Sequence, residues 1–290
     1  MKEMTVIIPA FNEEKALADT IGKLRPYAEK NNWNILVIND GSTDKTHDIL
    51  KNIPNIKLIT HKINRGYGAS LKTGLLNTDT ELAAFYDADG QHRPEDLEKL
   101  KNELDDQDML VGERSKNSYK AANRAFGKWV LKKTADFLSG KKIPDLNSGL
   151  RIVRRNVILK YLDLFPDGFS FSTTSTIAFL SDKRLVGYIP VTTNKRTGKS
   201  SVNQIRDGFN TIMLILRLIT LFNPIKVFVP ASLFLVTTSI IYEIIWGYIL
   251  SPHLKLLPGA LLTFLTGVII FFFALIMDQV SQLRRNSIGR

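Results

Sequence analysis

The stretch Leu82-Ala-Ala-Phe-Tyr-Asp-Ala-Asp-Gly-Gln91 decides the fold. Its first five residues are apolar or aromatic, which is the pattern of a short buried strand. The strand delivers Asp87 at its carboxyl end. Upstream, similar short apolar runs alternate with longer helical segments, and this alternation predicts an α/β fold. We expect a parallel, doubly covered sheet with its site at the carboxyl ends of the strands.

The individual elements are predicted from the same periodicities. Strands are expected at 5–9, 34–39, 56–60, 82–86, 109–112, 150–153 and 186–191. Helices are expected from about 12 to 30 and then at 44–52, 67–76, 94–102 and 118–138. Residues 205–222 mix charges with an apolar stretch, which suits a helix lying in a membrane interface.

Asp87 and Asp89 carry the chemical signal. Two carboxylates separated by one residue at a strand end can hold a divalent cation that also binds a diphosphate. Taken alone, this pair is more often a polar turn after a strand. The apolar strand before it, the polar run 90–96 after it and the acids at two earlier strand ends favour the functional interpretation.

The last part of the chain predicts a membrane anchor. The segments 227–250 and 256–277 are each long and apolar enough to cross a hydrocarbon core of about 30 Å, and residues 252–255 form a tight connection between them. Glu243, the one charge in the first span, is expected to reach the outer interface. Lysine and arginine flank the hairpin on its outer sides, at 206, 217, 226, 284, 285 and 290, against Lys255 alone in the connection. This bias places both chain ends in the cytoplasm.

Composition agrees with a cytoplasmic domain held at a membrane. The chain has 290 residues, no cysteine and a net charge of +11, so a disulfide framework and a thiolate metal site are excluded. The N-terminus is too quickly interrupted by Pro9 to be a signal peptide. Basic residues concentrate between 114 and 160, and five of them, at 116, 120, 124, 128 and 132, form one stripe of the predicted helix. We expect this stripe to dock on an anionic leaflet rather than to be a merely solvated face.

Five motifs occur in order along the first 151 residues: Val6-Ile-Ile-Pro-Ala-Phe-Asn-Glu-Glu14, Asn39-Asp-Gly-Ser-Thr-Asp44, Asn64-Arg-Gly-Tyr-Gly-Ala-Ser-Leu-Lys72, Asp87-Ala-Asp-Gly-Gln91 and Asn147-Ser-Gly-Leu-Arg151. Together they resemble the family 2 glycosyltransferases. With the two C-terminal spans they are most similar to the polyprenyl-phosphate glycosyltransferase group, which includes dolichyl-phosphate mannose synthase. The resemblance covers about residues 4–200 and implies the GT-A nucleotide-sugar transferase fold.

The resemblance also implies how the chain is divided into domains and where each domain lies relative to the membrane. Residues 1–204 would be a cytoplasmic GT-A catalytic domain, 205–223 an amphipathic interfacial helix, 224–278 the transmembrane hairpin and 279–290 a basic cytoplasmic tail.

Site roles follow from the resemblance by position. Pro9, Glu13 and Asp40 would contact the base and ribose of a nucleotide sugar, although Asp40 could also serve turn chemistry. Asp87, Asp89 and Gln91 would form the metal site, and this all-oxygen set fits Mg²⁺ or Mn²⁺ better than zinc. Arg114, Arg124 and Arg196 match positions that handle the acceptor phosphate and, with Asp89, would be catalytic. Lys72, Ser148, Arg151 and Lys199 complete the substrate-binding set, with Arg151 expected to brace the site.

The implied reaction is inverting transfer of a hexose from a nucleotide sugar to a polyprenyl phosphate. That acceptor is already ionised near neutral pH and needs no general base. UDP-glucose, UDP-N-acetylglucosamine and GDP-mannose all stay open as donors, because Arg93 and the segment 168–174 depart from the mannose synthases. Family analogy adds a flippase and a downstream transferase as partners, a possible homo-oligomer and no nucleic acid.

Three alternatives remain at this point. The chain could glycosylate another lipid or glycan acceptor, or be a non-catalytic basic adaptor at a membrane or on nucleic acid. A processive polysaccharide synthase is disfavoured because neither Gln204 nor Gln282 starts a Gln-x-x-Arg-Trp motif.

Overall fold

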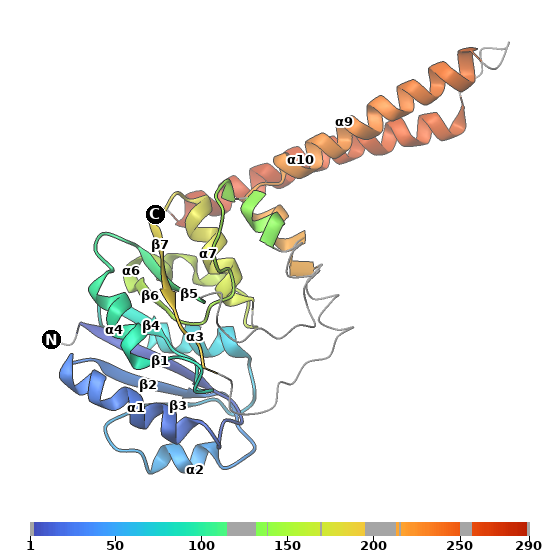
Figure 1. Cartoon of the computed structure of the whole chain (residues 1–290). Coiled ribbons are helices and arrows are strands. Elements are labelled where there is room, and N and C mark those ends of the chain that lie inside the picture. Colours follow the sequence, from blue (N-terminus) through green and yellow to red (C-terminus); the bar gives the residue numbers. More distant parts are fainter. Residues whose placement is uncertain are drawn as a thin grey trace. The chain divides into compact units, whose positions relative to one another are not determined.

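The computed structural model describes residues 3–114, 132–137, 139–168, 170–194, 213–214, 216–249 and 257–288. The chain separates into two compact units, residues 1–208 and 209–290. The first is the α/β unit and the second contains the long C-terminal helices (Figure 1). Each is described by itself below.

A seven-stranded sheet forms the centre of the described part of the first unit. Its strands are β1 Met4–Ala10, β2 Asn34–Asn39, β3 Lys57–Thr60, β4 Leu82–Phe85, β5 Met109–Arg114, β6 Arg151–Arg154 and β7 Val186–Val191, in the order β3-β2-β1-β4-β6-β5-β7. The helices are α1 Leu17–Lys30, α2 Thr46–Lys51, α3 Tyr67–Leu76, α4 Pro94–Asn102, α6 Arg155–Ile158 and α7 Phe171–Ser181, with a 3₁₀ segment, η2, at Leu159–Leu164.

The sheet is mixed, so the prediction of an all-parallel sheet is wrong. The β1–β2, β1–β4, β2–β3 and β5–β7 pairs are parallel, as expected, but β6 runs antiparallel to both β4 and β5. Local sequence sets the alternation of side chains along a strand and not the direction in which the strand enters the sheet. The reversal has a consequence for the site, because the start of β6 lies at the edge where the parallel strands end.

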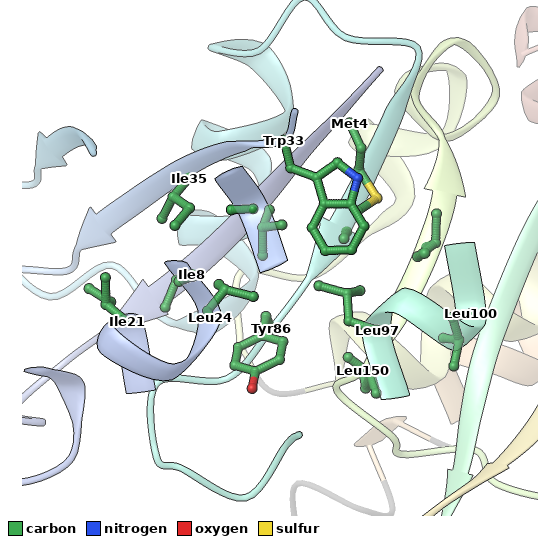
Figure 2. Packing of buried hydrophobic residues seen from close by; sticks show 14 of the residues in the cluster. Met4, Ile8, Ile21, Leu24, Trp33, Ile35, Tyr86, Leu97, Leu100 and Leu150 are labelled. Carbon is green, nitrogen blue, oxygen red and sulfur yellow. The ribbon is translucent and has the colours of Figure 1, made fainter. Parts of the chain in front are cut away.

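Side chains of β1 alternate between two layers of helices. On one face, Val6 and Ile8 belong to a buried hydrophobic cluster. Figure 2 shows part of this cluster, with Ile21 and Leu24 of α1, Leu97 and Leu100 of α4, and Tyr86 after β4. On the other face Ile7 lies against Gly74 of α3, and Phe85 of β4 packs edge-on against Phe171 of α7, with ring centroids 5.8 Å apart. The central strands β1 and β4 are therefore buried on both sides, as their continuous apolar runs predict.

The second unit contains a hairpin of two apolar helices. Helix α9 spans Ile225–Tyr242 and continues as a π-helical turn, η3, over Glu243–Ile249, and α10 spans Pro258–Ile288. Both are long and apolar enough to cross a membrane, over Ile225–Gly247 and Pro258–Leu283. Hydroxyl groups join them: Ser232 Oγ donates to Gly267 O at 2.8 Å and Ser239 Oγ to Ala260 O at 2.6 Å. Such bonds and small residues are the usual means of packing helices in lipid.

Glu243 has a specific partner in the hairpin. The backbone N–H of Leu257 donates to its carboxylate, at 3.2 Å to Oε2, so Glu243 satisfies one of the amides left open at the start of α10. The sequence predicted only that this carboxylate reaches the interface.

Several helix predictions need correction. The first helix begins at Leu17 and not near residue 12, because Asn12 adopts a φ of 55° and residues 13–16 form turns. Helices α6 and α7 and the η2 segment were not predicted, since the Ser/Thr-rich start of α7 has the composition of a loop. Helix α10 runs on to Ile288, through most of the expected tail. Of the predicted basic helix the structure describes 132–137 as helical, and of the interfacial segment 213–214 and 216–222; the remaining positions lie outside the described residues.

Close packing of α3 on β1 gives a stability prediction. A Cβ placed on Gly74 would overlap Ile7 Cγ2, whereas a Cβ on Gly22 of α1 would meet nothing within 4 Å. We expect Gly74→Ala to lower the free energy of unfolding by about 1–3 kcal/mol through overpacking. Gly22→Ala should be neutral or stabilise by up to about 1 kcal/mol, because alanine is the better helix former. Thermal unfolding of the full chain in detergent checks both, and equal shifts for the two variants would contradict the packing argument.

Candidate functional site

One edge of the sheet collects the polar motifs. β1, β2 and β4 end there and lead into the segments 11–14, 40–46 and 86–92. Because β6 is antiparallel, its first residue lies at the same edge, where Arg151 pairs with Phe85. Four of the five sequence motifs thus meet at the carboxyl edge, and the third, at the start of α3, contacts them through Tyr67 and the Arg65–Gly66 turn.

The loops that follow β1 and β2 are joined to each other. Thr43 N donates to Asn12 Oδ1 at 2.8 Å, and Glu13 N donates to Thr46 Oγ1 at 2.9 Å. Pro9 lies just before this junction, in register with Ile38. Its missing N–H is tolerated because β4 pairs with β1 only as far as Ile7.

Asp40 is buried and binds the next motif along the chain. Its Oδ1 accepts from Arg65 N at 3.0 Å and lies 2.6 Å from His61 Nδ1, and its Oδ2 accepts from Gly66 N at 2.8 Å. These contacts are long-range and not those of a local turn. They connect the end of β2 to the start of α3.

Asp87 is held from three sides. Tyr67 Oη donates to its Oδ1 at 3.0 Å, and His92 Nε2 lies 3.0 Å from its Oδ2. On the third side the backbone of Gly149 is so close that a Cβ there would overlap the carboxylate. Burial acts to raise the pKa of Asp87, but His92, the Tyr67 hydroxyl and the charge of Arg151 lower it overall. Asp87 is therefore ionised at neutral pH.

Asp89 and Gln91 lie in the turn that follows. Gln91 N donates to Asp89 Oδ1 at 3.1 Å. The backbone oxygen of Gln91 accepts from Asn194 N at 2.9 Å, and its side-chain Nε2 donates to Asn194 O at 3.4 Å. The Thr20 hydroxyl of α1 donates to Ala88 O at 3.1 Å and so joins the same turn to α1. We call residues 87–91 the acidic turn. Gln91 therefore joins the segment that follows β7 to the acidic turn through hydrogen bonds.

Arg114 forms a two-pronged ion pair with Asp145. Its Nε lies 2.7 Å from Oδ2 and its Nη2 lies 2.8 Å from Oδ1. Burial raises the pKa of Asp145, but the bonds and charge of Arg114 outweigh it, so that pKa lies below its usual value. The guanidinium predicted to grip a phosphate is thus engaged by a carboxylate in this structure.

Arg151 is fully buried and donates to neutral acceptors. Its Nη1 donates to Ser172 O at 3.0 Å, Ser175 Oγ at 3.1 Å and Thr176 Oγ1 at 3.2 Å, and its Nε donates to Ser148 O at 3.2 Å. Burial lowers the pKa of Arg151, yet an arginine stays protonated in proteins. The first turns of α7 therefore solvate a buried positive charge near Asp87. The bracing role of Arg151 stays a prediction.

Lys72 of α3 pairs with Asp167, at 2.7 Å from Nζ to Oδ1. The backbone of residues 166–168 lies against the start of α3, where Ala69 N donates to Asp167 O at 3.0 Å. A Cβ on Gly66 would come within 2.5 Å of Asp167 O, and Gly66 also has a φ of 102°. Glycine is needed there for the close approach of two backbones and for the positive φ.

The acidic turn has the donors that a hard cation prefers. No group of three or more His, Cys, Asp or Glu side chains suited to a metal occurs within the described part of the chain. The candidate set is two carboxylates and one amide, all oxygen ligands, which fits Mg²⁺ or Mn²⁺ when a diphosphate completes the coordination.

Comparison with known proteins decides the family. Residues 5–162 match the family described as Glycosyl transferase family 2, and residues 223–283 match the GtrB C-terminal hairpin. The chain belongs to glycosyl transferase family 2. It is accordingly a transferase of sugars, and its second unit contains the matched C-terminal hairpin, whose two helices are candidate membrane spans.

Characterised relatives of this family 2 glycosyltransferase act on lipid phosphates. It is 30% identical over 219 residues to the UDP-N-acetylglucosamine–dolichyl-phosphate N-acetylglucosaminyltransferase of Methanococcus voltae, covering 66% of this chain and 86% of that one. It is 30% identical over 222 residues to the polyprenol monophosphomannose synthase of Mycolicibacterium smegmatis, covering 70% and 83%. An uncharacterised protein of Methanocaldococcus jannaschii is 33% identical over 181 residues, covering 59% of this chain and 73% of that one.

Solved structures confirm the GT-A-like fold. Glucosyl-3-phosphoglycerate synthase from Mycobacterium tuberculosis, in complex with Mn²⁺, UDP and glucosyl-3-phosphoglycerate, superimposes with a TM-score of 0.60 over 76% of this chain and 79% of that one. At 16% identity this likeness concerns the fold alone.

The structure brings most of the predicted site residues of the family 2 glycosyltransferase to one edge. Asp87, Asp89, Gln91, Ser148 and Arg151 lie around the acidic turn, and Pro9, Glu13 and Asp40 lie at the neighbouring strand ends. Lys72 and Arg114 instead form the ion pairs described above. Arg124, Arg196 and Lys199 lie outside the described residues.

Sequence reasoning assigned no role to Tyr67, His92, Asp145 or Gly149. Tyr67, His92 and Gly149 lie in or beside quoted motifs, and that position was the available signal. Asp145 carried none, because its partner Arg114 is distant in the sequence.

The Arg114–Asp145 pair predicts a pH-dependent loss of stability. The pKa of Asp145 is lower in the folded chain than the roughly 3.9 of an unfolded aspartate. Its contribution is therefore present above about pH 3.9 and is lost as the pH falls through the lower folded value. We expect Asp145→Asn to cost about 1 kcal/mol at pH 7, a modest figure because the Arg114 side chain is 43% exposed.

Melting temperatures of the full chain at pH 7 and at pH 3 measure this effect. The difference between parent and Asp145→Asn should narrow at the lower pH. Asp19→Asn, which removes the exposed ion pair with Lys23, is the control and should change little at either pH. An undiminished difference for Asp145→Asn at pH 3 would contradict the role of the ion pair.

Proposed function

We propose that the chain transfers a hexose, with inversion, from a nucleoside diphosphate sugar to a polyprenyl phosphate at the cytoplasmic face of a membrane. One observation carries the proposal: a family 2 domain and a two-helix membrane hairpin occur in one chain. An enzyme that takes a lipid acceptor must meet it at the bilayer, and a hairpin tethers the catalytic unit there. The names of the relatives, which specify dolichyl phosphate and polyprenol, support this acceptor.

The donor would bind at the carboxyl edge of β1, β2 and β4. Asp87, Asp89 and Gln91 would hold a Mg²⁺ or Mn²⁺ ion, which there supplies positive charge to the departing diphosphate. Pro9, Glu13 and Asp40 lie at the adjacent strand ends, where the base and ribose would reach. The hydroxyl of Ser148 is buried and has no partner among the described residues, so it can donate to a bound sugar or phosphate.

In the reaction, an oxygen of the acceptor phosphate forms a bond to the anomeric carbon. The bond from that carbon to the diphosphate oxygen breaks, and its electron pair leaves with the nucleoside diphosphate. Bringing two anions together is the main obstacle, so positive charge near the edge is the useful property. Arg151 supplies a fixed buried charge, and Arg114 supplies a guanidinium that exchanges Asp145 for phosphate. Arg124, Arg196 and Lys199 would add to this charge.

Transfer to lipid phosphate tests the function. Purified full chain is incubated with undecaprenyl or dolichyl phosphate and labelled UDP-glucose, UDP-N-acetylglucosamine or GDP-mannose. A lipid product labile to mild acid supports the phosphate acceptor. Label in a different lipid or glycan supports the alternative acceptor, and no transfer from any donor sinks the proposal.

Loss of one carboxylate of the acidic turn should strongly reduce this activity. We expect Asp89→Asn to lower kcat/KM by at least about 100-fold, because it removes a charge that holds the cation. A chelator should abolish transfer and added Mn²⁺ or Mg²⁺ should restore it. Asp48→Asn, at an exposed position of α2, is the matched control. Transfer that persists in chelator would overturn the metal requirement.

Orientation is testable because the chain has no cysteine. We propose that both termini are cytoplasmic, as the distribution of lysine and arginine predicts. A membrane-impermeant maleimide should label Ser251→Cys, in the connection, from outside intact cells. It should label Ser287→Cys, near the end of α10, only after permeabilisation. The reverse pattern would contradict the orientation.

A further inference from the structure

Tyr67 and His92, from different parts of the chain, each hydrogen-bond with one oxygen of the Asp87 carboxylate. Tyr67 is the first residue of α3, and its hydroxyl donates to Asp87 Oδ1 at 3.0 Å. His92 follows the acidic turn, is 8% exposed, and faces Asp87 Oδ2 at 3.0 Å. A carboxylate oxygen accepts, so the His92 ring nitrogen is the donor of this hydrogen bond.

These two hydrogen bonds determine which way the carboxylate faces. The last torsion of an aspartate side chain is broad when nothing holds it. In Asp87 it is held by one donor on each oxygen, while the backbone of Gly149 leaves no room on the third side. Both donors are themselves fixed. Gly66, which precedes Tyr67, is bonded to Asp40, and the backbone oxygen of His92 accepts from Tyr86 Oη at 2.7 Å.

Tyr67 also contacts the first turn of α7. Burial raises the pKa of Tyr67 well above its usual value, and the Ser172 side chain is close enough to act in the opposite direction. The backbone oxygen of Ser172 accepts from the buried Arg151 at 3.0 Å. Ser172 therefore lies between Arg151, which donates to it, and Tyr67, which donates to Asp87. Displacement of α7 would move the Tyr67 hydroxyl and, with it, the carboxylate.

We propose that Tyr67 and His92 are positioning residues that set the Asp87 carboxylate for donor binding, and that Tyr67 couples this carboxylate to α7. The inference rests on the proposed function for its substrate, a nucleoside diphosphate bound with a divalent cation. It assigns to the Asn64–Lys72 motif a task other than touching that substrate: the motif presents a hydroxyl that holds an acid of the next motif.

Tyr67→Phe is the direct test, because it removes one hydroxyl and keeps the ring. Tyr161→Phe is its control. Tyr161 is buried and, like Tyr67, donates to a carboxylate, Asp182 Oδ2, at 2.9 Å. Asp182 caps the end of α7 opposite the first turn, and within the described part of the chain no hydrogen bond or ring contact joins Tyr161 to residues 87–91. Calorimetric titration of the full chain with UDP and with GDP, each with Mn²⁺, measures binding without turnover. We expect Tyr67→Phe to weaken the binding of whichever nucleotide the parent takes by about tenfold, and Tyr161→Phe by less than about twofold.

Thermal unfolding separates positioning from general damage. The two phenylalanine variants should shift the melting temperature by similar amounts, since each loses one partly buried hydrogen bond from a hydroxyl to a carboxylate. If both variants bind the nucleotide more weakly, each in proportion to the fall of its melting temperature below that of the parent, the proposal is overturned.

Variants of His92 and Gly149 probe the other two sides. His92→Gln keeps a donor where Nε2 lies and should retain most of the affinity, whereas His92→Leu should lose it as Tyr67→Phe does. Gly149→Ala removes no polar group but displaces the carboxylate, and should weaken binding to a similar degree. Ser172→Ala should weaken it in the same direction. Unchanged binding in Ser172→Ala would overturn the link to α7.

The outcomes distinguish this inference from the function on which it rests. If the parent binds a nucleotide with Mn²⁺ and Tyr67→Phe loses affinity, but no sugar reaches polyprenyl phosphate, the positioning role stands and the proposed acceptor fails. If the parent transfers sugar and Tyr67→Phe behaves as Tyr161→Phe does, the positioning role fails and the function stands. A parent that binds neither nucleotide overturns both.

Discussion

A carboxylate that has lost part of its water is kept ionised by donors and nearby positive charge that replace this water. The Asp87 side chain is 27% exposed. Asp87 meets this condition with three separate segments: the start of α3 supplies Tyr67, the turn after β4 supplies His92, and the Asn147–Arg151 motif supplies the close backbone of Gly149 and the charge of Arg151. Each of these segments is held in place by further bonds. The arrangement of the candidate site therefore depends on the hydrogen bonds and the positive charge that surround the Asp87 carboxylate.

Arg151 is the complementary constraint. A fully buried guanidinium without a carboxylate partner needs other acceptors, and the described structure supplies backbone oxygens and the hydroxyls of Ser175 and Thr176. This explains why the first half of α7 is rich in serine and threonine and yet buried. It also gives the site a positive charge that does not depend on a mobile side chain. In a reaction that brings two anions together, such a charge stabilises the developing diphosphate without reorganisation.

The two units divide the work physically. The α/β unit builds a polar edge on a sheet whose central strands are buried on both faces. The hairpin packs two apolar helices through small and hydroxylated residues such as Ser232, Gly267 and Ser239. A sugar nucleotide is a water-soluble ligand and a polyprenyl phosphate is a lipid, so the proposed reaction needs both kinds of surface in one chain. The family assignment of each unit agrees with this division.

The sequence by itself determined the α/β class, the strands, three helices to within a residue or two and the existence of the membrane hairpin, because hydrophobic periodicity and length are local properties. It also identified Asp87 and Asp89 through their place after an apolar strand. Only the tertiary structure decided that β6 runs antiparallel, that α7 is a helix, and that Arg114 pairs with Asp145. These depend on partners far apart in the sequence: Arg151 makes the polar start of α7 a buried helix, and the reversed β6 brings Gly149 against Asp87. Local pattern carries no record of such partners, and for that reason the residues that hold Asp87 became visible only in the fold.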